Sequence, residues 1–355
     1  MLTKALRKKE HDVLVASFKR QYPQWLFPGK TDKDPSLSPL RIGGVNYWLD
    51  SMNPGTWIAT FFRIRRHRPE VIVVQWWTTF WAPAWWMLGV LNRLLLRAEL
   101  LFYCHNVLPH ETRRFDRWLA RLALRQGTAF TAQSTQEKHQ LLSLVPGARV
   151  TVLLLPTFDL LAEHWVPRSQ AREQLDIAED LPVLLFFGIV REYKGLADLL
   201  KALPIVKARV GPVLLIVAGE FWDDKQKYLD LIRQGGIEDS LLVDDRYIPD
   251  EEAAVYFSAA DLLVAPYRSA TGSAVLPTAR AFRLPIVTTE LPGTTPAVDG
   301  RSDRLVPPRN PEALAAAIIE ALADTARPGP SIASESDDDT WDRVIAAIEE
   351  TVRRD

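Results

Sequence analysis

The chain has 355 residues, of which 47% are hydrophobic and 25% charged, and its formal net charge is −1 at neutral pH. This length predicts two domains of ordinary size, and the composition is typical of a globular protein. The near-neutral charge gives no electrostatic case for nucleic acid as a partner. The single cysteine, Cys104, excludes an internal disulfide and a cysteine-based zinc cluster, and it favours a reducing, cytoplasmic compartment.

The opening stretch, MLTKALRKKEHDVLVASF, has a charged segment and only a short apolar run, so we predict no signal peptide. Its helix-like part, KALRKKEH, runs directly into a strand, whereas a doubly wound domain normally opens with a strand and a glycine-bearing turn. The most apolar region is Phe80–Cys104. Charged residues interrupt it before about 18 apolar residues accumulate, so it is not expected to span a membrane.

The N-terminal half alternates strands with helices. Its apolar runs are apolar throughout, which indicates strands covered on both faces, as in a parallel sheet. The expected strands are Asp12–Phe18, Glu70–Trp77, Glu99–Asn106, Ala129–Ser134 and Arg149–Pro156. The expected helices are Thr56–Arg66, Ala84–Leu96, Arg114–Arg125 and Thr135–Leu144.

The second half repeats the pattern more regularly, which predicts a second doubly wound α/β domain. Its expected strands are Pro182–Gly188, Val213–Gly219, Ser240–Ile248, Asp261–Tyr267 and Leu284–Glu290. Its expected helices are Lys194–Arg209, Asp224–Gly236, Asp250–Ala260, the segment after Ser273, Asn310–Thr325 and a last amphipathic helix, Thr340–Asp355. The polar stretch Thr157–Asp180 is expected to link the domains, and Arg327–Asp339 is expected to have little order.

Two cations follow the first strand of the second half. Gly188 ends this strand, and Arg191 and Lys194 lie in the loop before the next helix. Cations at the carboxyl end of a parallel strand, beside a helix N-terminus, suit a diphosphate; the alternative is a solvated basic loop. One strand later, Glu220 follows Gly219 and is expected to face the same crevice.

Two further segments of the second half are candidates for binding. Thr271, Gly272 and Ser273 precede a helix whose first amides could hold phosphate or sugar oxygens, although both hydroxyl residues could equally act as N-caps. Tyr247 and Ile248, at an expected strand tip, form an apolar segment that could contact a nucleobase.

The N-terminal half offers a histidine and an aromatic cluster. His105 directly follows a buried strand and is a site candidate or a satisfied loop histidine. His110 and Glu111 follow, but the spacing does not match the HExxH zinc signature, and no metal is expected. Core packing is the default interpretation of the five tryptophans in QWWTTFWAPAWW. A sugar-stacking surface and a peripheral membrane patch remain open as alternatives. The basic run RIRRHRP would favour anionic lipid in the second of these.

The second half resembles the nucleotide-donor domain of retaining glycosyltransferases of family 4 (glycosyl transferase group 1), which have the GT-B fold. The resemblance runs in order through FGIVREYKGLADLLKAL, LLIVAGEF, YIPDEEAAVYFSAADLLVAPY, GSAVLPTARAFRLPIVTT and LVPPRNPEALAAAI. The first half is similar more loosely, through SFKRQYPQWLFPGKTDKDPS and CHNVLPHE, to one bacterial and archaeal subgroup.

The resemblance implies two Rossmann-like domains that face a cleft. We expect an acceptor-side domain at 1–156, a linker at 157–180, a donor domain at 181–326, and a segment 327–355 whose helix returns to the N-terminal domain. The family opens with a strand and a glycine-rich loop that this sequence does not show before KALRKKEH. A catalytically impaired scaffold that binds nucleotide or a partner without transfer is therefore the alternative to an active enzyme.

The resemblance also implies roles for individual residues. Arg191 and Lys194 match the diphosphate-binding pair that stabilises the departing nucleotide, and His105 matches a histidine near the transferred sugar. Ala270 and Thr278 stand where the family usually has two glutamates, which a subgroup with similar loops also lacks. The expected donor-binding residues are Gly188, Glu220, Tyr247, Ile248, Thr271, Gly272, Ser273, Ala274, Val275 and Thr278.

We therefore expect a retaining glycosyltransferase that moves a hexose-type sugar from a nucleotide-diphosphate sugar to a saccharide or lipid-linked acceptor, as in polysaccharide biosynthesis. The resemblance implies no obligatory metal and no cofactor beyond the nucleotide-sugar co-substrate. The expected location is cytoplasmic, with peripheral contact at the inner face of the membrane left open. A nucleotide-sugar epimerase with the same fold is a third interpretation.

Overall fold

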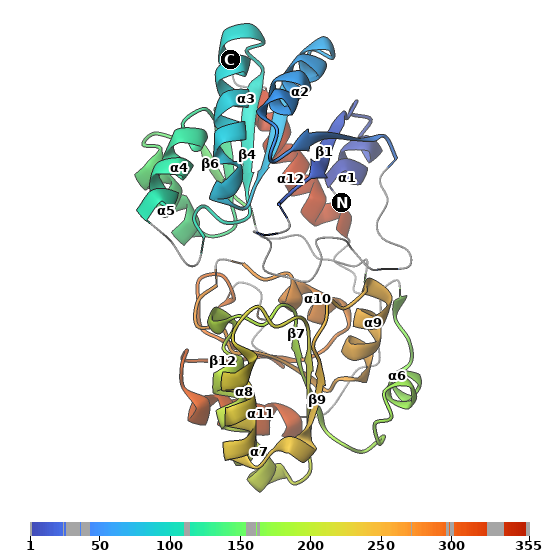
Figure 1. Ribbon diagram of the computed structural model, residues 1–355. Coiled ribbons are helices and arrows are strands. Elements are labelled where there is room, and N and C mark those ends of the chain that lie inside the picture. The colour runs from blue at the N-terminus through green and yellow to red at the C-terminus, as the bar shows by residue number, and fades with distance from the viewer. Residues whose placement is uncertain are drawn as a thin grey trace. The chain divides into compact units, whose positions relative to one another are not determined.

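A computed structural model describes residues 2–23, 25, 36, 43–109, 114–153, 161, 164–270, 272–295, 298, 302–324 and 337–352. The chain divides into two compact units (Figure 1). Unit 1 comprises Met1–Phe27, Leu40–Leu155 and Asp338–Asp355, and unit 2 comprises Pro28–Pro39 and Pro156–Asp337. Both units alternate strands with helices.

Unit 1 contains a four-stranded parallel sheet in the order β3-β4-β5-β6 and a separate parallel pair, β1-β2. Its strands are β1 (Val15–Arg20), β2 (Val45–Asp50), β3 (Val71–Trp76), β4 (Glu99–Cys104), β5 (Ala129–Ala132) and β6 (Val150–Val152). Its helices are α1 (Leu2–Lys8), α2 (Pro54–Arg66), the short η2 (Thr79–Trp81), α3 (Ala82–Leu95), α4 (Arg114–Leu124), α5 (Thr135–Leu144) and α12 (Asp337–Val352).

The main sheet of unit 1 is covered on both faces, which explains why β4 is apolar throughout. On one face, Phe102 of β4 stacks against Phe130 of β5 with ring centroids 5.9 Å apart, within a core shared with α3, α4 and α5. On the other face, Leu101 and Tyr103 pack with Val344 and neighbouring apolar residues of α12. The last helix of the chain therefore belongs to the core of unit 1.

Unit 2 contains a six-stranded parallel sheet in the order β12-β11-β10-β7-β8-β9. Its strands are β7 (Val183–Phe187), β8 (Leu214–Ala218), β9 (Leu241–Asp244), β10 (Leu262–Ala265), β11 (Ile286–Thr289) and β12 (Arg304–Val306). Its helices are α6 (Arg168–Gln174), the short η4 (Glu192–Lys194), α7 (Leu196–Val210), α8 (Lys225–Gly235), the short η5 (Glu238–Ser240), α9 (Asp250–Ala259), α10 (Val275–Ala281) and α11 (Pro311–Ala323).

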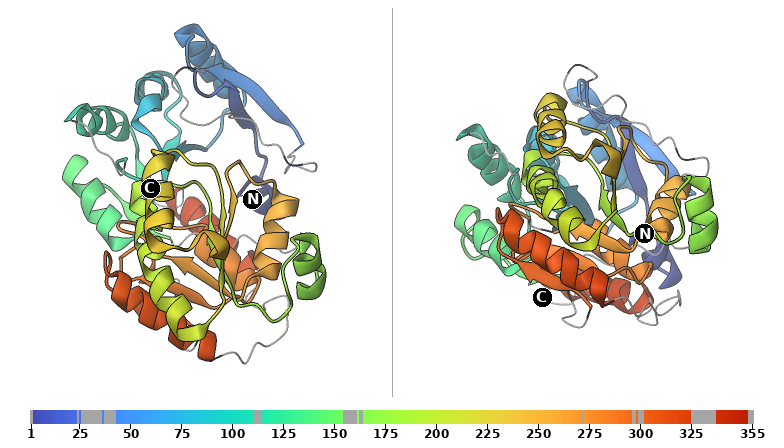
Figure 2. Two further views of the ribbon diagram at one scale, coloured as in Figure 1. Left: turned by 60° about the horizontal axis from the view of Figure 1, so that its bottom comes forward. Right: turned by 90° about the horizontal axis from the view of Figure 1, so that it is seen from below.

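Helices cover both faces of this sheet (Figure 2). Helices α7, α8 and α11 share one apolar core with the strands, and α9 and α10 share another. The chain builds β7, β8 and β9 outward in one direction and then returns to place β10 on the other side of β7. The boundary between β7 and β10 is therefore the topological switch point, where ligands of open α/β sheets bind beyond the carboxyl ends of the strands.

The predicted α/β alternation is confirmed, with differences at particular elements. Strand β2, helix α6 and the three-residue β12 were not predicted; α6 lies inside the expected linker. The expected strand Ser240–Ile248 ends at Asp244, so Tyr247 and Ile248 belong to the following loop. Among the described helices, none is long and apolar enough to cross a membrane.

Candidate functional site at the carboxyl edge of the unit 2 sheet

Three loops meet at the switch point of unit 2, and two glycines allow them to approach. A Cβ atom on Gly219, which has φ +145°, would lie 2.2 Å from the carbonyl oxygen of Gly188. A Cβ on Gly195, which has φ +75°, would lie 1.8 Å from the carbonyl oxygen of Pro266. A Cβ atom does not fit at these distances, so both positions require glycine for the loops after β7, β8 and β10 to pack together.

Lys194 lies at the centre of this assembly. Its Nζ is 3.4 Å from the hydroxyl of Tyr267 and 4.9 Å from the centroid of that ring. The Tyr267 hydroxyl is in turn 2.9 Å from Oγ of Ser273, in the loop before α10. A Cβ on Gly188 would lie 3.7 Å from Nζ and 3.8 Å from a methyl of Val275. The fold thus gathers four predicted site residues, Gly188, Lys194, Ser273 and Val275, around Tyr267.

The Lys194 side chain is an ammonium at neutral pH. Its burial works against the charge, but the hydroxyl groups of Tyr267 and Tyr193 outweigh that effect, so the pKa of Lys194 is raised from its ordinary value. No carboxylate in the described part of the chain forms an ion pair with it. A positive charge held in place without an acidic partner is suited to a negatively charged ligand.

Arg191 lies beside the loop that follows β8. Val190 and Phe221 form a short parallel bridge, which places the guanidinium of Arg191 over the ring of Trp222, 4.9 Å from its centroid. The Trp222 indole N–H donates to a carboxylate oxygen of Glu220 at 2.9 Å, and Glu220 is only 6% exposed. Within the described ranges, Arg191 forms no ion pair either, so both cations remain available to an anion.

Arg268 joins two of the loops. Its guanidinium donates two hydrogen bonds of 2.8 Å to the carboxylate of Asp198 in the first turn of α7. Its backbone N–H donates to the carbonyl of Tyr193 at 2.7 Å, and a third, longer bond reaches Glu192. Arg268 therefore holds the loop after β10 against the short helix η4 that carries Lys194, a positioning role that the sequence did not reveal.

The loop before α10 differs in part from the prediction. Thr271 lies outside the described residues. Helix α10 begins at Val275 after Ala274 with no side-chain cap, because the Ser273 hydroxyl is engaged with Tyr267. The N-cap interpretation is thus wrong for Ser273.

Ala270 and Thr278, the positions of the missing glutamates, are both buried, and the Thr278 hydroxyl donates to the Ala274 carbonyl. Thr278 therefore fills core space and does not join the cluster around Tyr267.

Tyr247 and Ile248 lie in the loop after β9. Both follow the edge strand β9, which β8 separates from β7. Ile248 is 7% exposed and packs in the core under α9, whereas the Tyr247 side chain is 43% exposed. The side chain of Ile248 therefore belongs to the core, and a contact of this residue with the donor stays a prediction for its backbone.

His105 follows β4 in unit 1 and is held by two glutamines. Its Nε2 is 2.7 Å from Oε1 of Gln75, and its Nδ1 is 3.4 Å from Nε2 of Gln133. An amide oxygen only accepts and an amide nitrogen only donates, so this arrangement suits a neutral imidazole with its proton on Nε2. Burial lowers the pKa of His105 and favours the same neutral form. Neither glutamine was predicted, since each comes from a different strand end.

Glu137 stabilises the loops around His105 through hydrogen bonds to their backbone. The side chain is fully buried, and its carboxylate accepts hydrogen bonds from the backbone N–H groups of Val107, at 3.2 Å, and Gln133, at 3.0 Å. Burial raises the pKa of Glu137 to about 7, although both hydrogen bonds oppose that shift. The carboxyl group therefore joins the loop after β4 to the loop after β5. Because it is buried there, its ionised form is less stable than it would be in water.

We expect the free energy of unfolding to fall as the pH rises from about 4.5 to about 7. The Glu137 carboxyl has a pKa of 4.5 in an unfolded chain and about 7 in the fold, so over this window the unfolded state releases a proton that the folded state keeps. The loss is complete above the folded pKa and amounts to about 3 kcal/mol. Urea unfolding of the intact chain at several pH values measures it, with Glu137→Gln as the control that lacks this slope. An identical slope in both proteins would contradict the expectation.

The aromatic cluster of unit 1 is core. Trp76, Trp81 and Trp85 are each no more than 7% exposed, and Phe18 packs against the latter two. Trp77 donates its indole N–H to the Tyr22 hydroxyl at 2.9 Å. Core packing is thus the correct interpretation for Trp76, Trp81 and Trp85. Trp86 is 39% exposed, so core packing does not account for this residue.

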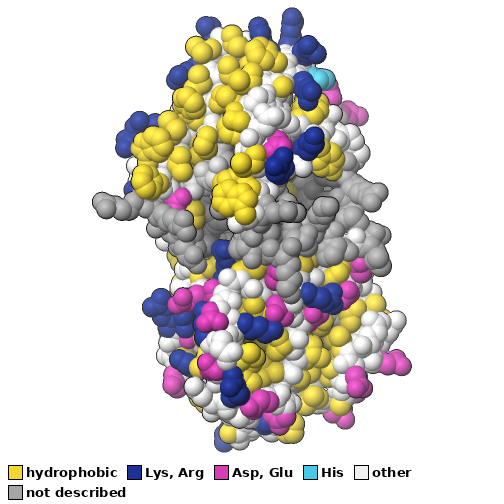
Figure 3. Space-filling model, in the orientation of Figure 1, with side chains coloured by type: hydrophobic (Ala, Val, Ile, Leu, Met, Phe, Trp, Pro, Cys, Tyr) yellow, Lys and Arg dark blue, Asp and Glu magenta, His cyan; other side chains and the backbone are white. Residues whose placement is uncertain are grey.

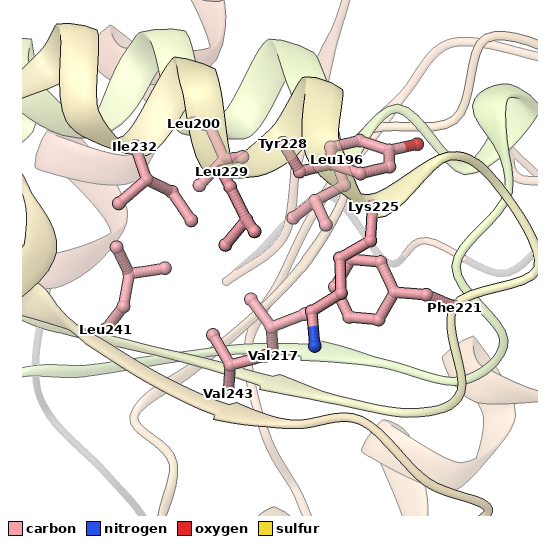
Figure 4. Close-up of a pocket in the computed structure, with 10 residues that line it drawn as sticks. All are labelled: Leu196, Leu200, Val217, Phe221, Lys225, Tyr228, Leu229, Ile232, Leu241 and Val243. Atoms are coloured by element: carbon pink, nitrogen blue, oxygen red, sulfur yellow. The ribbon is translucent and has the colours of Figure 1, made fainter.

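The lining of a small cavity in unit 2 includes none of the residues of the Lys194 cluster (Figure 4). It is enclosed by α7, α8 and the strands β8 and β9, and its volume of about 10 Å³ is close to that of one water molecule. Its lining is apolar apart from two long side chains, and comprises Leu196, Leu200, Val217, Phe221, Lys225, Tyr228, Leu229, Ile232, Leu241 and Val243. A cavity of this size is a packing defect and not a binding site.

Comparisons with known proteins agree with the two-part organisation. Residues 1–156 match the family model of a glycosyl transferase 4-like domain, and residues 181–324 match that of glycosyl transferases group 1. A D-inositol 3-phosphate glycosyltransferase from Catenulispora acidiphila is 32% identical over 210 residues, which are 55% of this chain and 49% of the relative. The chain spans about half the length of the curated relatives it matches.

Solved structures with the same fold cover most of the chain. Sucrose-phosphate synthase from Thermosynechococcus elongatus has a TM-score of 0.65 at 20% identity and covers 99% of this chain and 89% of its own. HepE from Anabaena, solved in complex with UDP and glucose, also has a TM-score of 0.65 at 20% identity, with 86% of this chain and 83% of its own covered. These similarities confirm the predicted fold class.

Proposed function

Because this chain belongs to the glycosyl transferases of group 1 and has their GT-B type of fold, we propose that it transfers a sugar from a nucleotide-diphosphate sugar to a saccharide or lipid-linked acceptor. We further propose that it acts on a hexose with retention of the anomeric configuration and needs no metal ion. The relative named above is a glycosyltransferase, and HepE has been solved with UDP and glucose, which makes uridine diphosphate sugars the first donors to test.

The observation that carries the proposal is the pair of cations at the switch point. Arg191 and Lys194 lie at the carboxyl end of β7, and within the described residues neither has a carboxylate partner. When a glycosidic bond to a diphosphate breaks, negative charge accumulates on the leaving phosphate oxygens. Cations held ready at that point stabilise the transition state more than the ground state and so accelerate the reaction.

The remaining site residues have supporting roles in this proposal. The Tyr267 hydroxyl holds the Lys194 ammonium and the Ser273 hydroxyl together, so that loop groups of α10 reach the same ligand. His105 is neutral, and the amides of Gln75 and Gln133 occupy both of its ring nitrogens. We assign it to the transferred sugar, one of whose hydroxyl groups would replace one of these amides as the partner of the ring.

Incubating the intact protein with a panel of nucleotide sugars and saccharide or lipid-linked acceptors tests the proposal. We expect one donor to be consumed in step with the appearance of a glycosylated acceptor, at a rate that EDTA does not change. Proton NMR of the new linkage should show the anomeric configuration of the donor; an inverted product would contradict retention.

Two outcomes would point elsewhere. Nucleotide binding in calorimetry without donor turnover for any acceptor would favour the scaffold alternative. Release of nucleotide together with an altered monosaccharide, independent of acceptor, would favour an epimerase.

A further inference from the structure

Three helices of unit 1 lie side by side and present large apolar side chains to solvent. Helix α3 packs against α2 on one side and α4 on the other. Hydrophobic side chains gather over α3 and α4 on the face shown in Figure 3. The strongly exposed apolar residues of the three helices are Ile58 (43%), Phe62 (42%), Trp86 (39%), Leu94 (65%), Leu95 (41%), Phe115 (77%) and Trp118 (62%). We call their outer surface the α2–α4 face.

Helix α4 has apolar residues on two opposite sides. Ala120, Ala123 and Leu124 are fully buried and fix the helix on the core. Phe115 and Trp118, one turn apart, project away from that core with more than half of each side chain exposed. Core packing accounts for the first set and not for the second. Exposed aromatic residues gathered in one area mark an interaction surface.

The same face is strongly basic. The three helices carry three arginines in α2, one in α3 and three in α4, whereas their one acidic residue is Asp116, which accepts a hydrogen bond from the Thr79 hydroxyl. The whole chain, by contrast, has a net charge of −1. Arg117, Arg121 and Arg125 follow one another at intervals of one helical turn, next to the exposed aromatic pair. All three are exposed, and none forms an ion pair within the described part of the chain.

The combination of arginine with exposed tryptophan and phenylalanine suits a lipid interface. Aromatic rings sit at the level of the headgroups, and guanidinium groups bind phosphate oxygens. A second copy of this chain would bring an equally positive face, and the like charges would repel. The described helices include none that could span a bilayer, so the contact would be peripheral.

We propose that the α2–α4 face docks onto membranes that contain anionic phospholipids. Phe115 and Trp118 enter the headgroup region, and Arg117, Arg121 and Arg125 bind lipid phosphates. This surface is separate from the Lys194 cluster, which lies in unit 2, so the inference does not depend on the sugar-transfer proposal.

Co-sedimentation of the intact protein with vesicles tests the inference. We expect binding to vesicles of phosphatidylcholine with 30 mol% phosphatidylglycerol, weak binding to pure phosphatidylcholine, and weaker binding at high salt, since surface charges are screened there. Replacing the three arginines together (Arg117→Gln, Arg121→Gln, Arg125→Gln) should lower the partition coefficient roughly a hundredfold, at about 1 kcal/mol per charge.

A second variant addresses the aromatic pair. Phe115→Ser with Trp118→Ser should lower the partition coefficient about tenfold, because the apolar area that enters the interface is lost. Both side chains are exposed, so far-UV circular dichroism should show an unchanged fold. Trp165→Ser in unit 2, where the ring is 41% exposed, is the matched aromatic control. Gln replacements at Lys201, Arg209 and Arg233, exposed cations of unit 2, are the matched charge control.

Three results would overturn the proposal. The first is equal binding to neutral and anionic vesicles. The second is retention of full binding by both face variants, or a loss of binding as large in the unit 2 controls. The third is a concentration-dependent dimer in light scattering that the face variants abolish while vesicle binding is absent, which would make the face an interface between copies of this chain.

Discussion

Replacing Lys194 by methionine is expected to lower kcat by about a hundredfold to a thousandfold, the effect of removing one preorganised group that stabilises developing charge. Methionine keeps an unbranched apolar stem over the Tyr267 ring, so the loop should keep its shape while the charge is lost. Since charge builds up only as the bond breaks, we expect KM for the donor to change much less than kcat. Initial rates over a range of donor concentrations separate the two parameters.

Four further variants sharpen this test. Lys194→Arg keeps the charge but not its position beside Gly188, and should recover only part of the activity. Arg191→Met should also reduce turnover, and the double variant shows whether the two cations act on the same oxygen atoms. Lys201→Met removes an exposed lysine of α7 and should have no effect. Normal turnover in the Lys194, Arg191 double variant would refute the assignment of both residues.

Replacing Arg172 by methionine is expected to destabilise unit 2 by about 4 kcal/mol or more, the effect of removing one partner of a buried ion pair and leaving buried carbonyls unpaired. The Arg172 side chain is 1% exposed and donates to the carboxylate of Asp261 at 2.8 Å. It also donates to four backbone carbonyl groups, those of Ala178, Glu179, Leu181 and Ala259. It thereby joins the segment before β7 to α9 and β10.

A neighbouring arginine provides the control. Arg168 is 34% exposed and forms ion pairs with Glu179 and Asp261, so Arg168→Met should cost about 1 kcal/mol or less. Urea unfolding followed by circular dichroism and by tryptophan fluorescence gives both free energies and shows whether the two units unfold in one step. Equal losses for the two variants would mean that the burial of Arg172 is not what makes it important.

The local elements of the fold were largely predictable. Strand β4 reads ELLFYC and helix α7 reads LADLLKALPIVKARV; in each, a local hydrophobic pattern and flanking residues indicate both the type and the extent of the element. Strand β2, VNYWLD, was missed because it is short and ends in Asp50, and because among the described strands it pairs only with β1. Helix α6 was missed because it is short and polar, and its position depends on the buried Arg172.

The candidate site was predictable only in part. Gly188, Arg191 and Lys194 are close in sequence, so their placement after one strand could be inferred. Tyr267 is seventy-three positions from Lys194, and it becomes a partner only because β10 returns to lie beside β7. The clamp on His105 likewise depends on β3 and β5 flanking β4 in the sheet.

The amino-acid sequence by itself determined the strand–helix alternation, the group 1 motifs and the cations beside a strand end, since each depends on residues close together in the chain. Tertiary structure alone decided which residues meet at the switch point, that Trp76, Trp81 and Trp85 are buried, and that Phe115 and Trp118 are exposed. Trp118 has the same side chain as the buried tryptophans. Whether each is inside or outside depends on which neighbours the packed helices and strands supply, and that is a property of the fold as a whole.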